Sequence, residues 1–363
     1  MGFKCAIVGL PNVGKSSLFN AMTSSAIAAE NYAFCTIEPN VGVVAVPDPR
    51  LQCIADIALP QRVVPSTMEF VDIAGLVEGA SLGEGLGNRF LAHIRETQAL
   101  AHVVRCFDDD KVAHVSGRID PIGDIEVVEM ELALADLEMV TRGLENAEKQ
   151  AKSGDKNACE RVECLTELLS GLDAGIAVRA MPLKDATRSL LRQFSLLTAR
   201  PVVFVANVDE SNIGGNALSA TVEEYAAEHG AETVVLNAAV EAEIAALDPD
   251  ERADFLIELG LEEPGLNRII RAGYRLLGLQ SFFTADPKVC RAWTVRTGAR
   301  APAAAAVIHT DFERGFIRAE VIGYEDFVTL GGEAGARDAG RLRVEGRDYV
   351  VEDGDVIYFR FNV

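Results

Sequence analysis

Long apolar runs, paired cysteines and basic residues are all scarce in this sequence. No apolar run approaches the roughly 18 residues that a membrane-spanning helix needs, and the chain begins with a strand-like segment rather than with the features of a signal peptide. The seven cysteines are odd in number and form no Cys-x-x-Cys pair, which argues against a disulfide or zinc framework. We therefore expect a cytoplasmic protein whose thiols are buried.

Basic residues are too few to balance the acidic ones. Lys and Arg total 34 against 55 Asp and Glu, which gives a formal net charge of −21. This surplus argues against a surface that follows nucleic-acid phosphates or an anionic membrane over its whole extent. About half of the surplus falls in residues 198–278, whereas residues 279–363 are almost balanced and contain ten arginines. We therefore expect any contact with RNA to be local and to involve this last segment.

The order of the predicted elements indicates an α/β fold. Apolar, β-rich runs alternate with helical stretches along the first 125 residues, and two more strands follow residue 200. This alternation predicts a mostly parallel sheet with crossover helices. The expected strands cover residues 3–9, 41–46, 67–73, 100–107, 201–207 and 232–237, and the expected helices cover 15–26 and 88–97.

We place this α/β part at residues 1–125 and 198–278. Two other parts of the chain have different residue patterns. Residues 126–197 repeat apolar side chains at steps of three and four and predict a helical hairpin, a coiled-coil-like insertion that turns near Gly154. Residues 279–363 predict a small α+β domain. Its expected strands are 293–295, 316–321, 348–351 and 356–361, and its expected helix is 301–306.

The strongest chemical signal lies between the first strand and the first helix. The segment from Gly9 to Ser16 matches the P-loop pattern GxxxxGK[ST], in the strand-to-helix context that the motif requires. In such a loop, backbone N–H groups and the helix N-terminus surround the phosphates. Lys15 would reach the β- and γ-phosphates, and the hydroxyl of Ser16 would bind Mg²⁺.

Two further segments fit the magnesium end of such a site. Asp72 and Gly75 form a DxxG pattern at a strand end, where the carboxylate can hold Mg²⁺ and the glycine N–H can contact the γ-phosphate. Thr36 lies in the loop before the second strand, where a threonine can complete the Mg²⁺ shell; an ordinary turn residue is the alternative. We therefore expect Mg²⁺ as cofactor, with Ser16, Thr36 and Asp72 as candidate ligands.

The segment Asn207–Glu210 stands where GTPases carry the guanine-reading pattern NKxD. Here Val208 replaces the lysine and Glu210 replaces the aspartate. The longer carboxylate would collide with or miss the guanine edge, and adenine has no N2 amino group to donate to it. The spacing thus indicates a GTPase ancestor, whereas the chemistry favours ATP. Asn207, Val208 and Glu210 are the candidate base contacts, and Asn237 begins a loop that fits beside the base.

With these motifs, the chain resembles the Obg-like ATPases, the YchF family of the P-loop GTPase superclass, over essentially its whole length. The resemblance includes residues 31–40, 72–88, Arg105–Phe107 and the tail from residue 291. Small departures are Ala33, where proline is common, and Ser17, where threonine is common.

The resemblance implies an Obg-type, Ras-like nucleotide domain, a coiled-coil insertion and a C-terminal β-grasp domain of the TGS type. It also implies ATP as the nucleotide and association with the ribosome, through the large subunit or the 70S particle. Mg²⁺ would lie on Ser16 and Thr36. The implied nucleotide contacts are Asn12, Val13, Gly14, Lys15, Ser16, Ser17 and Val208.

Hydrolysis needs a group that positions water, because Leu76 stands where small GTPases place glutamine. The family uses a histidine in the segment that follows Phe107, so His114 is the catalytic candidate beside Lys15; a solvated bystander is the alternative. Asn12 occupies a position at which some P-loop GTPases hold K⁺ between phosphates. The alternative is that Asn12 stabilises the loop through a side-chain bond to the backbone.

Three functions follow from these features. The leading one is an ATP-hydrolysing switch that binds the ribosome and acts in translation, as a monomer and without a membrane partner. The second is a true GTPase in ribosome assembly. The third is a non-catalytic module that holds nucleotide as a structural ligand, which Leu76 would permit.

Overall fold

The structure divides the chain into two compact units. The computed structural model describes residues 3–24, 40–73, 86–109, 118–152, 154–191 and 193–362. One unit comprises residues 1–44 and 69–269, and the other comprises residues 45–68 and 270–363. Each unit is built on a six-stranded sheet of its own.

The first unit contains the expected mostly parallel sheet, which confirms the α/β fold class. Its strand order is β2-β4-β1-β5-β6-β7, and β1 pairs in parallel with both β4 and β5. Every residue of β5 and β6 is buried, as is typical of parallel strands with both faces covered. The strands are β1 (Lys4–Val8), β2 (Val41–Ala45), β4 (Thr67–Asp72), β5 (Ala99–Arg105), β6 (Val202–Asn207) and β7 (Glu232–Leu236).

Helices connect these strands, and the two that matter most for the site begin at its loops. Helix α1 starts directly after the P-loop, and α8 starts directly after Asn237, whose side chain accepts hydrogen bonds from the first turn of the helix. These two helices pack against each other. The helices of this unit are α1 (Lys15–Ser24), α3 (Leu86–Arg95), α7 (Ala217–Glu228), α8 (Ala238–Ala246) and α9 (Pro249–Glu258). Helix α10 (Gly265–Leu276) begins in this unit, and its residues from 270 onward belong to the second one.

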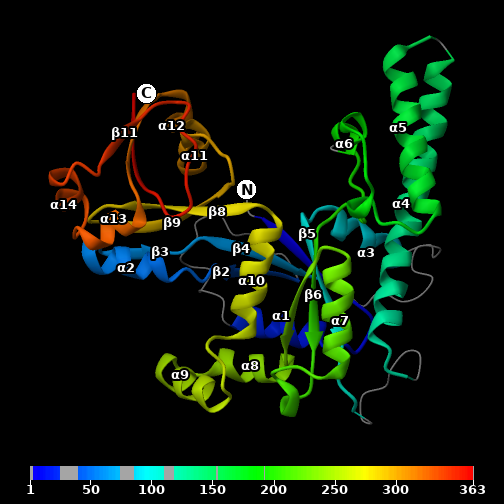
Figure 1. Ribbon diagram of the computed structural model, residues 1–363, viewed down its shortest axis with the longest axis horizontal. Coiled ribbons are helices and arrows are strands. Elements are labelled where there is room, and N and C mark those ends of the chain that lie inside the picture. Colours follow the sequence, from blue (N-terminus) through cyan, green and yellow to red (C-terminus); the bar gives the residue numbers. More distant parts are fainter. Residues whose placement is uncertain are drawn as a thin grey trace. The chain divides into compact units, whose positions relative to one another are not determined.

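The predicted helical hairpin is present, and its first helix begins earlier than expected. Helix α4 (Pro121–Ala151) and helix α5 (Lys156–Asp173) pack side by side, followed by the short α6 (Asp185–Leu191) (Figure 1). Asp120 caps α4 by accepting from the Gly123 N–H, and proline follows at the first helical position, a strong start signal. The hairpin has a core of its own, which includes Val140, Leu165 and Leu168.

The second unit has a mixed sheet with helices on both faces. Its strand order is β11-β10-β12-β8-β9-β3. One core lies between the sheet and α2, α13 and α14, and another lies between the sheet and α11 and α12 (Figure 1). The strands are β3 (Arg62–Val64), β8 (Leu279–Ala285), β9 (Val289–Arg296), β10 (Phe316–Ile322), β11 (Arg343–Glu345) and β12 (Val356–Phe361), and the helices are α2 (Pro49–Ala58), α11 (Ala301–Ile308), α12 (Thr310–Arg314), α13 (Tyr324–Thr329) and α14 (Glu333–Asp338).

Two features of this second unit differ from the sequence prediction. The strand expected at 348–351 is reduced to one isolated bridge between Arg300 and Val350. Residues 45–68, which the sequence places with the nucleotide domain, pack instead with the C-terminal unit. They do so because α2 buries Leu51 and Ile54 against the same core as Phe283.

Burial of the thiols follows the expectation in part. Cys5, Cys106, Cys164 and Cys290 are buried, whereas Cys159 is exposed. None of the helices in the described parts of the chain is long and apolar enough to span a membrane.

Candidate functional site

The loop between β1 and α1 has a backbone that two glycines make possible. Gly9 has φ of 147°, and a Cβ there would lie 2.4 Å from the Val103 carbonyl oxygen. Gly14 has φ of 102°, and a Cβ there would lie 2.3 Å from Nδ2 of Asn207. L-residues rarely adopt such angles, and the space is absent. The glycines of the motif are therefore required for the loop to close against β5 and Asn207.

Lys15 is folded back into this loop. Its side chain is buried, and Nζ donates a hydrogen bond of 2.6 Å to the Leu10 carbonyl oxygen. Burial lowers the pKa of Lys15 to about 8, and the nearby Asp72 carboxylate opposes this shift. Burial removes the water that would stabilise the charged amine, and a phosphate anion beside Nζ would stabilise that charge instead.

Ser16 and Asp72 come together from two different elements. The Ser16 hydroxyl lies 3.4 Å from Oδ2 of Asp72, the last residue of β4. The other oxygen, Oδ1 of Asp72, is buried, and no group in the described residues donates to it. Burial raises the pKa of Asp72, although Lys15 and Ser16 oppose the shift.

This pair of oxygen donors fits Mg²⁺. The ion usually keeps several waters and is bound by one or two carboxylates together with substrate phosphates. A buried carboxylate oxygen without a donor, beside a hydroxyl at the start of α1, matches that requirement. Bound Mg²⁺ would neutralise charge on the phosphates and orient them.

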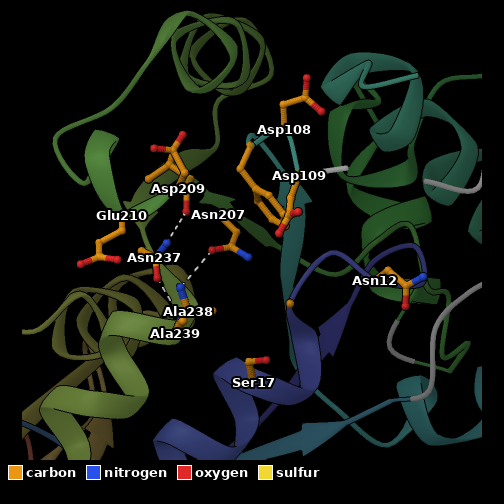
Figure 2. A pocket seen from close by; sticks show the side chains of 13 residues that line it. Asn12, Ser17, Asp108, Asp109, Asn207, Asp209, Glu210, Asn237, Ala238 and Ala239 are labelled. Carbon is orange, nitrogen blue, oxygen red and sulfur yellow. Dashed lines mark hydrogen bonds between the residues drawn. The ribbon is translucent and has the colours of Figure 1, made fainter. Parts of the chain in front are cut away.

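Asn207 ties the P-loop to the loop before α8. Its Nδ2 donates to the Val13 carbonyl oxygen at 2.9 Å. Its Oδ1 accepts from the Ala238 N–H at 2.9 Å (Figure 2). Asn237 works in the same way, because its Nδ2 donates to the Val208 carbonyl oxygen at 2.6 Å. The two asparagines hold three loops in one arrangement, and Asn207 also lines the pocket.

A pocket of about 720 Å³ lies between these loops. Figure 2 shows Asp108 and Asp109, which follow β5, on one side, and Asn207, Asp209 and Glu210 with the Asn237 loop on the other. None of the described residues that line the pocket is a lysine or an arginine, whereas four are acidic. Lys15, Ser16 and Asp72 are not among the lining residues, but Lys15 follows Gly14 directly in the P-loop. A triphosphate would extend from the pocket towards Lys15, which leaves the acidic lining for neutral, hydrogen-bonding parts of a ligand.

The structure brings most of the predicted nucleotide contacts to this pocket. Asn12, Gly14, Ser17, Asn207, Val208 and Glu210 line it. The side chains of Val13 and Val208 are buried, whereas Asn12 and Glu210 are exposed, and Asn12 has φ of 62°. Three predicted site residues, namely Thr36, Gly75 and His114, lie outside the described residues.

Sequence reasoning missed the wall formed after β5. Phe107, Asp108 and Asp109 line the pocket, and Arg105, which supports them, is almost fully buried. A usable signal exists, because ligands of open α/β sheets bind at the carboxyl ends of the strands. Strand β5 lies between β1 and β6, the strands that lead into the P-loop and into Asn207.

This geometry defines a P-loop nucleotide-binding protein. Residues 4–130 match the model of a family described as 50S ribosome-binding GTPases, and residues 279–362 match the model for the C-terminal part of YchF GTPases, described as a protein of unknown function. The chain is similar to the ribosome-binding ATPase YchF of Haemophilus ducreyi, with 58% identity over all of both chains, and to that of Bacillus subtilis, with 50% identity over all of both chains. The chain belongs to the YchF family.

A solved structure has the same fold. The YchF GTPase of Schizosaccharomyces pombe superposes on this chain with a TM-score of 0.89 at 33% sequence identity. The matched region covers 99% of this chain and 98% of the yeast chain. The names of these relatives differ in the nucleotide, ATP for the bacterial proteins and GTP for the yeast protein. The base site of this chain therefore has to be argued from its own residues.

Proposed function

We propose that this protein binds ATP with Mg²⁺ in the pocket between the P-loop and the Asn237 loop and hydrolyses it to ADP and phosphate. The observation that carries this proposal is the P-loop itself, with a buried Lys15 and with Ser16 beside the carboxylate of Asp72. Lys15 and the backbone N–H groups of the loop would stabilise charge on the β- and γ-phosphates. Ser16 and Asp72 would hold Mg²⁺, and Thr36 would complete the shell.

The chemistry of the base end supports ATP over GTP. Val208 and Glu210 stand where the guanine-reading pattern has lysine and aspartate, and both line the pocket. Glu210 is one methylene longer than the aspartate that would accept from N1 and N2 of guanine. A true GTPase that acts in ribosome assembly is the second candidate, which the name of the yeast relative favours.

Restoring the guanine pattern tests the preference directly. We expect the double variant Val208→Lys/Glu210→Asp to shift the ratio of the ATP and GTP dissociation constants towards GTP by at least about tenfold. The restored aspartate would accept hydrogen bonds from N1 and N2 of guanine, and adenine has no N2 amino group to donate. Competition titration measures both constants. Glu224→Asp, the same shortening on an exposed position of α7, is the matched control. A wild-type protein that already prefers GTP would refute the ATP assignment.

Three further groups complete the proposed chemistry. His114 would position the attacking water, since Leu76 is unable to do so; unchanged kcat and KM in His114→Ala would exclude this role. Asn12 would hold K⁺ between the phosphates, and equal turnover in KCl and NaCl at the same ionic strength would exclude K⁺. Gly75 would sense the γ-phosphate.

The relatives' names supply the partner. We propose that this chain associates with the large ribosomal subunit or the 70S particle in the cytoplasm, as a monomeric, nucleotide-dependent switch in translation. Arginines of residues 279–363 would make a local contact with ribosomal RNA if they cluster on one face. Six of the ten pair with carboxylates in the same unit, so this contact would fall to a subset of them. We propose a three-part division into an Obg-type domain (1–125 and 198–278), a coiled-coil insertion (126–197) and a TGS domain (279–363), in which residues 45–68 and 270–278 pack with the C-terminal unit.

Co-sedimentation with 70S particles and with isolated subunits tests the partner. We expect more protein in the ribosomal pellet with a non-hydrolysable ATP analogue than with ADP, and less as salt is raised, because phosphate contacts release counterions. Equal pelleting in both nucleotide states would contradict a nucleotide-dependent switch.

A further inference from the structure

Arg105 is a buried cation that the proposed chemistry does not use. It is the last residue of β5, and its side chain is 2% exposed. Burying a guanidinium is costly unless its surroundings compensate for the lost water, and an apolar side chain would fill the same volume at lower cost. The presence of Arg105 at this position therefore calls for a role beyond packing.

The guanidinium holds the segment that follows β5. Nε of Arg105 donates to the Phe107 carbonyl oxygen at 3.1 Å, and Nη2 donates to the Asp109 carbonyl oxygen at 3.3 Å. The guanidinium carbon lies 4.6 Å from the centre of the Phe107 ring, within the range of a cation–π contact. The planar fork of an arginine suits this task, because it can donate to two carbonyl groups in fixed directions while its face contacts a ring.

Two other hydrogen bonds attach the same segment to residues 207–216, which we call the base loop. The Cys106 N–H donates to the Asn207 carbonyl oxygen at 2.8 Å, and Nδ2 of Asn216 donates to the Cys106 carbonyl oxygen at 2.7 Å. Phe107, Asp108 and Asp109 thus form a fixed wall of the pocket next to the base loop. Gly14 and Ser17 of the P-loop line the same pocket.

We propose that Arg105 is a positioning residue that acts through Phe107 and fixes this wall against the base and ribose of the bound nucleotide. This inference rests on the proposed function, because it assumes that a nucleoside triphosphate occupies the pocket. Arg105 contributes to affinity for the nucleoside part and leaves phosphate binding and the chemical step to the P-loop.

Comparison of ATP with inorganic tripolyphosphate separates the two ends of the pocket. We expect Arg105→Lys to weaken ATP binding by about tenfold, because the forked donation and much of the ring contact are lost. Tripolyphosphate affinity should stay within about twofold of wild type, and the loss should appear in KM with kcat at saturation within about threefold. Arg142→Lys, the same change at an exposed arginine of α4, is the matched control.

A second variant keeps the proposal testable if the first one folds poorly. Phe107→Leu retains both carbonyl groups and removes the ring, and we expect a similar selective loss of ATP affinity. If Arg105 acts through Phe107, the double variant should lose little more than the larger single loss. The positioning role would be overturned if the double variant lost ATP affinity by the product of the two single losses. It would also be overturned if both single variants lost affinity equally for ATP and for tripolyphosphate.

The controls also distinguish this inference from the proposed function. If wild-type protein binds ATP more tightly than tripolyphosphate and both variants retain that advantage, the inference fails and the proposed function stands. If wild-type protein does not bind ATP, the proposed function fails, and the inference fails with it.

Discussion

Lys15→Met is expected to lower ATP turnover by on the order of 10²–10³-fold without destabilising the protein. None of the described residues that line the pocket carries a positive charge, whereas four are acidic. Lys15, buried in the P-loop directly after the lining residue Gly14, is the cation that we expect to meet the phosphates. Steady-state phosphate release under saturating ATP and Mg²⁺ measures the effect.

Stability should move in the opposite direction from activity in this variant. Burial lowers the pKa of Lys15 to about 8, which means that its charged form is held in the folded protein at a cost. Methionine fills a similar volume and removes that cost. We expect unchanged or higher resistance to denaturant together with lost turnover. Lys4→Met, at a partly exposed lysine that pairs with Glu69 on the neighbouring strand, is the control and should retain activity. Turnover within threefold of wild type would show that Lys15 is not the phosphate ligand.

The parts of the molecule that the sequence predicted well are those set by local pattern. The spacing of Gly9, Gly14, Lys15 and Ser16 is a contiguous motif, and the structure shows why its glycines are needed. Alternation of strand and helix gave the parallel sheet, and apolar steps of three and four gave the helical hairpin. Each of these signals is complete within a few tens of residues.

The parts that the sequence missed depend on contacts between distant segments. Helix α2 carries a local start signal, because Asp48 caps it and Pro49 opens it. Its membership of the second unit is decided by burial of Leu51 and Ile54 against Phe283, which lies more than 200 residues away. No local pattern contains that information.

The role of a polar side chain in the site also depends on distance rather than on motif. The pattern around Asn207 predicts a base contact, and only the structure shows that the same amide also bonds to Val13 and Ala238. Arg105 stands at the end of an apolar strand, where the sequence alone gives no partner for it. A buried arginine is rare, and its carbonyl partners become visible only once the strand order places the segment at the pocket.

Asp136→Ala is expected to destabilise the helical hairpin by about 3–5 kcal/mol. Asp136 is fully buried in α4 and accepts three hydrogen bonds: from the Leu197 N–H at 2.8 Å, from the Thr198 N–H at 2.8 Å and from the Thr198 hydroxyl at 2.7 Å. Alanine removes the acceptor and leaves three donors without a partner inside the protein. These bonds fix the point at which the chain leaves the hairpin and enters β6, the strand that ends at Asn207.

Hydrogen exchange is the measurement to use, because a chain of two units need not unfold in a single transition and a single midpoint would mix them. In Asp136→Ala the amides of Leu197 and Thr198 should exchange much faster, and protection in α4 and α5 should fall with them. Amides of β12, in the other unit, should keep their wild-type rates. Asp173→Ala, at an exposed aspartate that ends α5, is the matched control and should change stability by less than about 0.5 kcal/mol. Wild-type protection at residues 197 and 198 would mean that backbone packing, and not the Asp136 carboxylate, anchors the hairpin to the nucleotide-binding sheet.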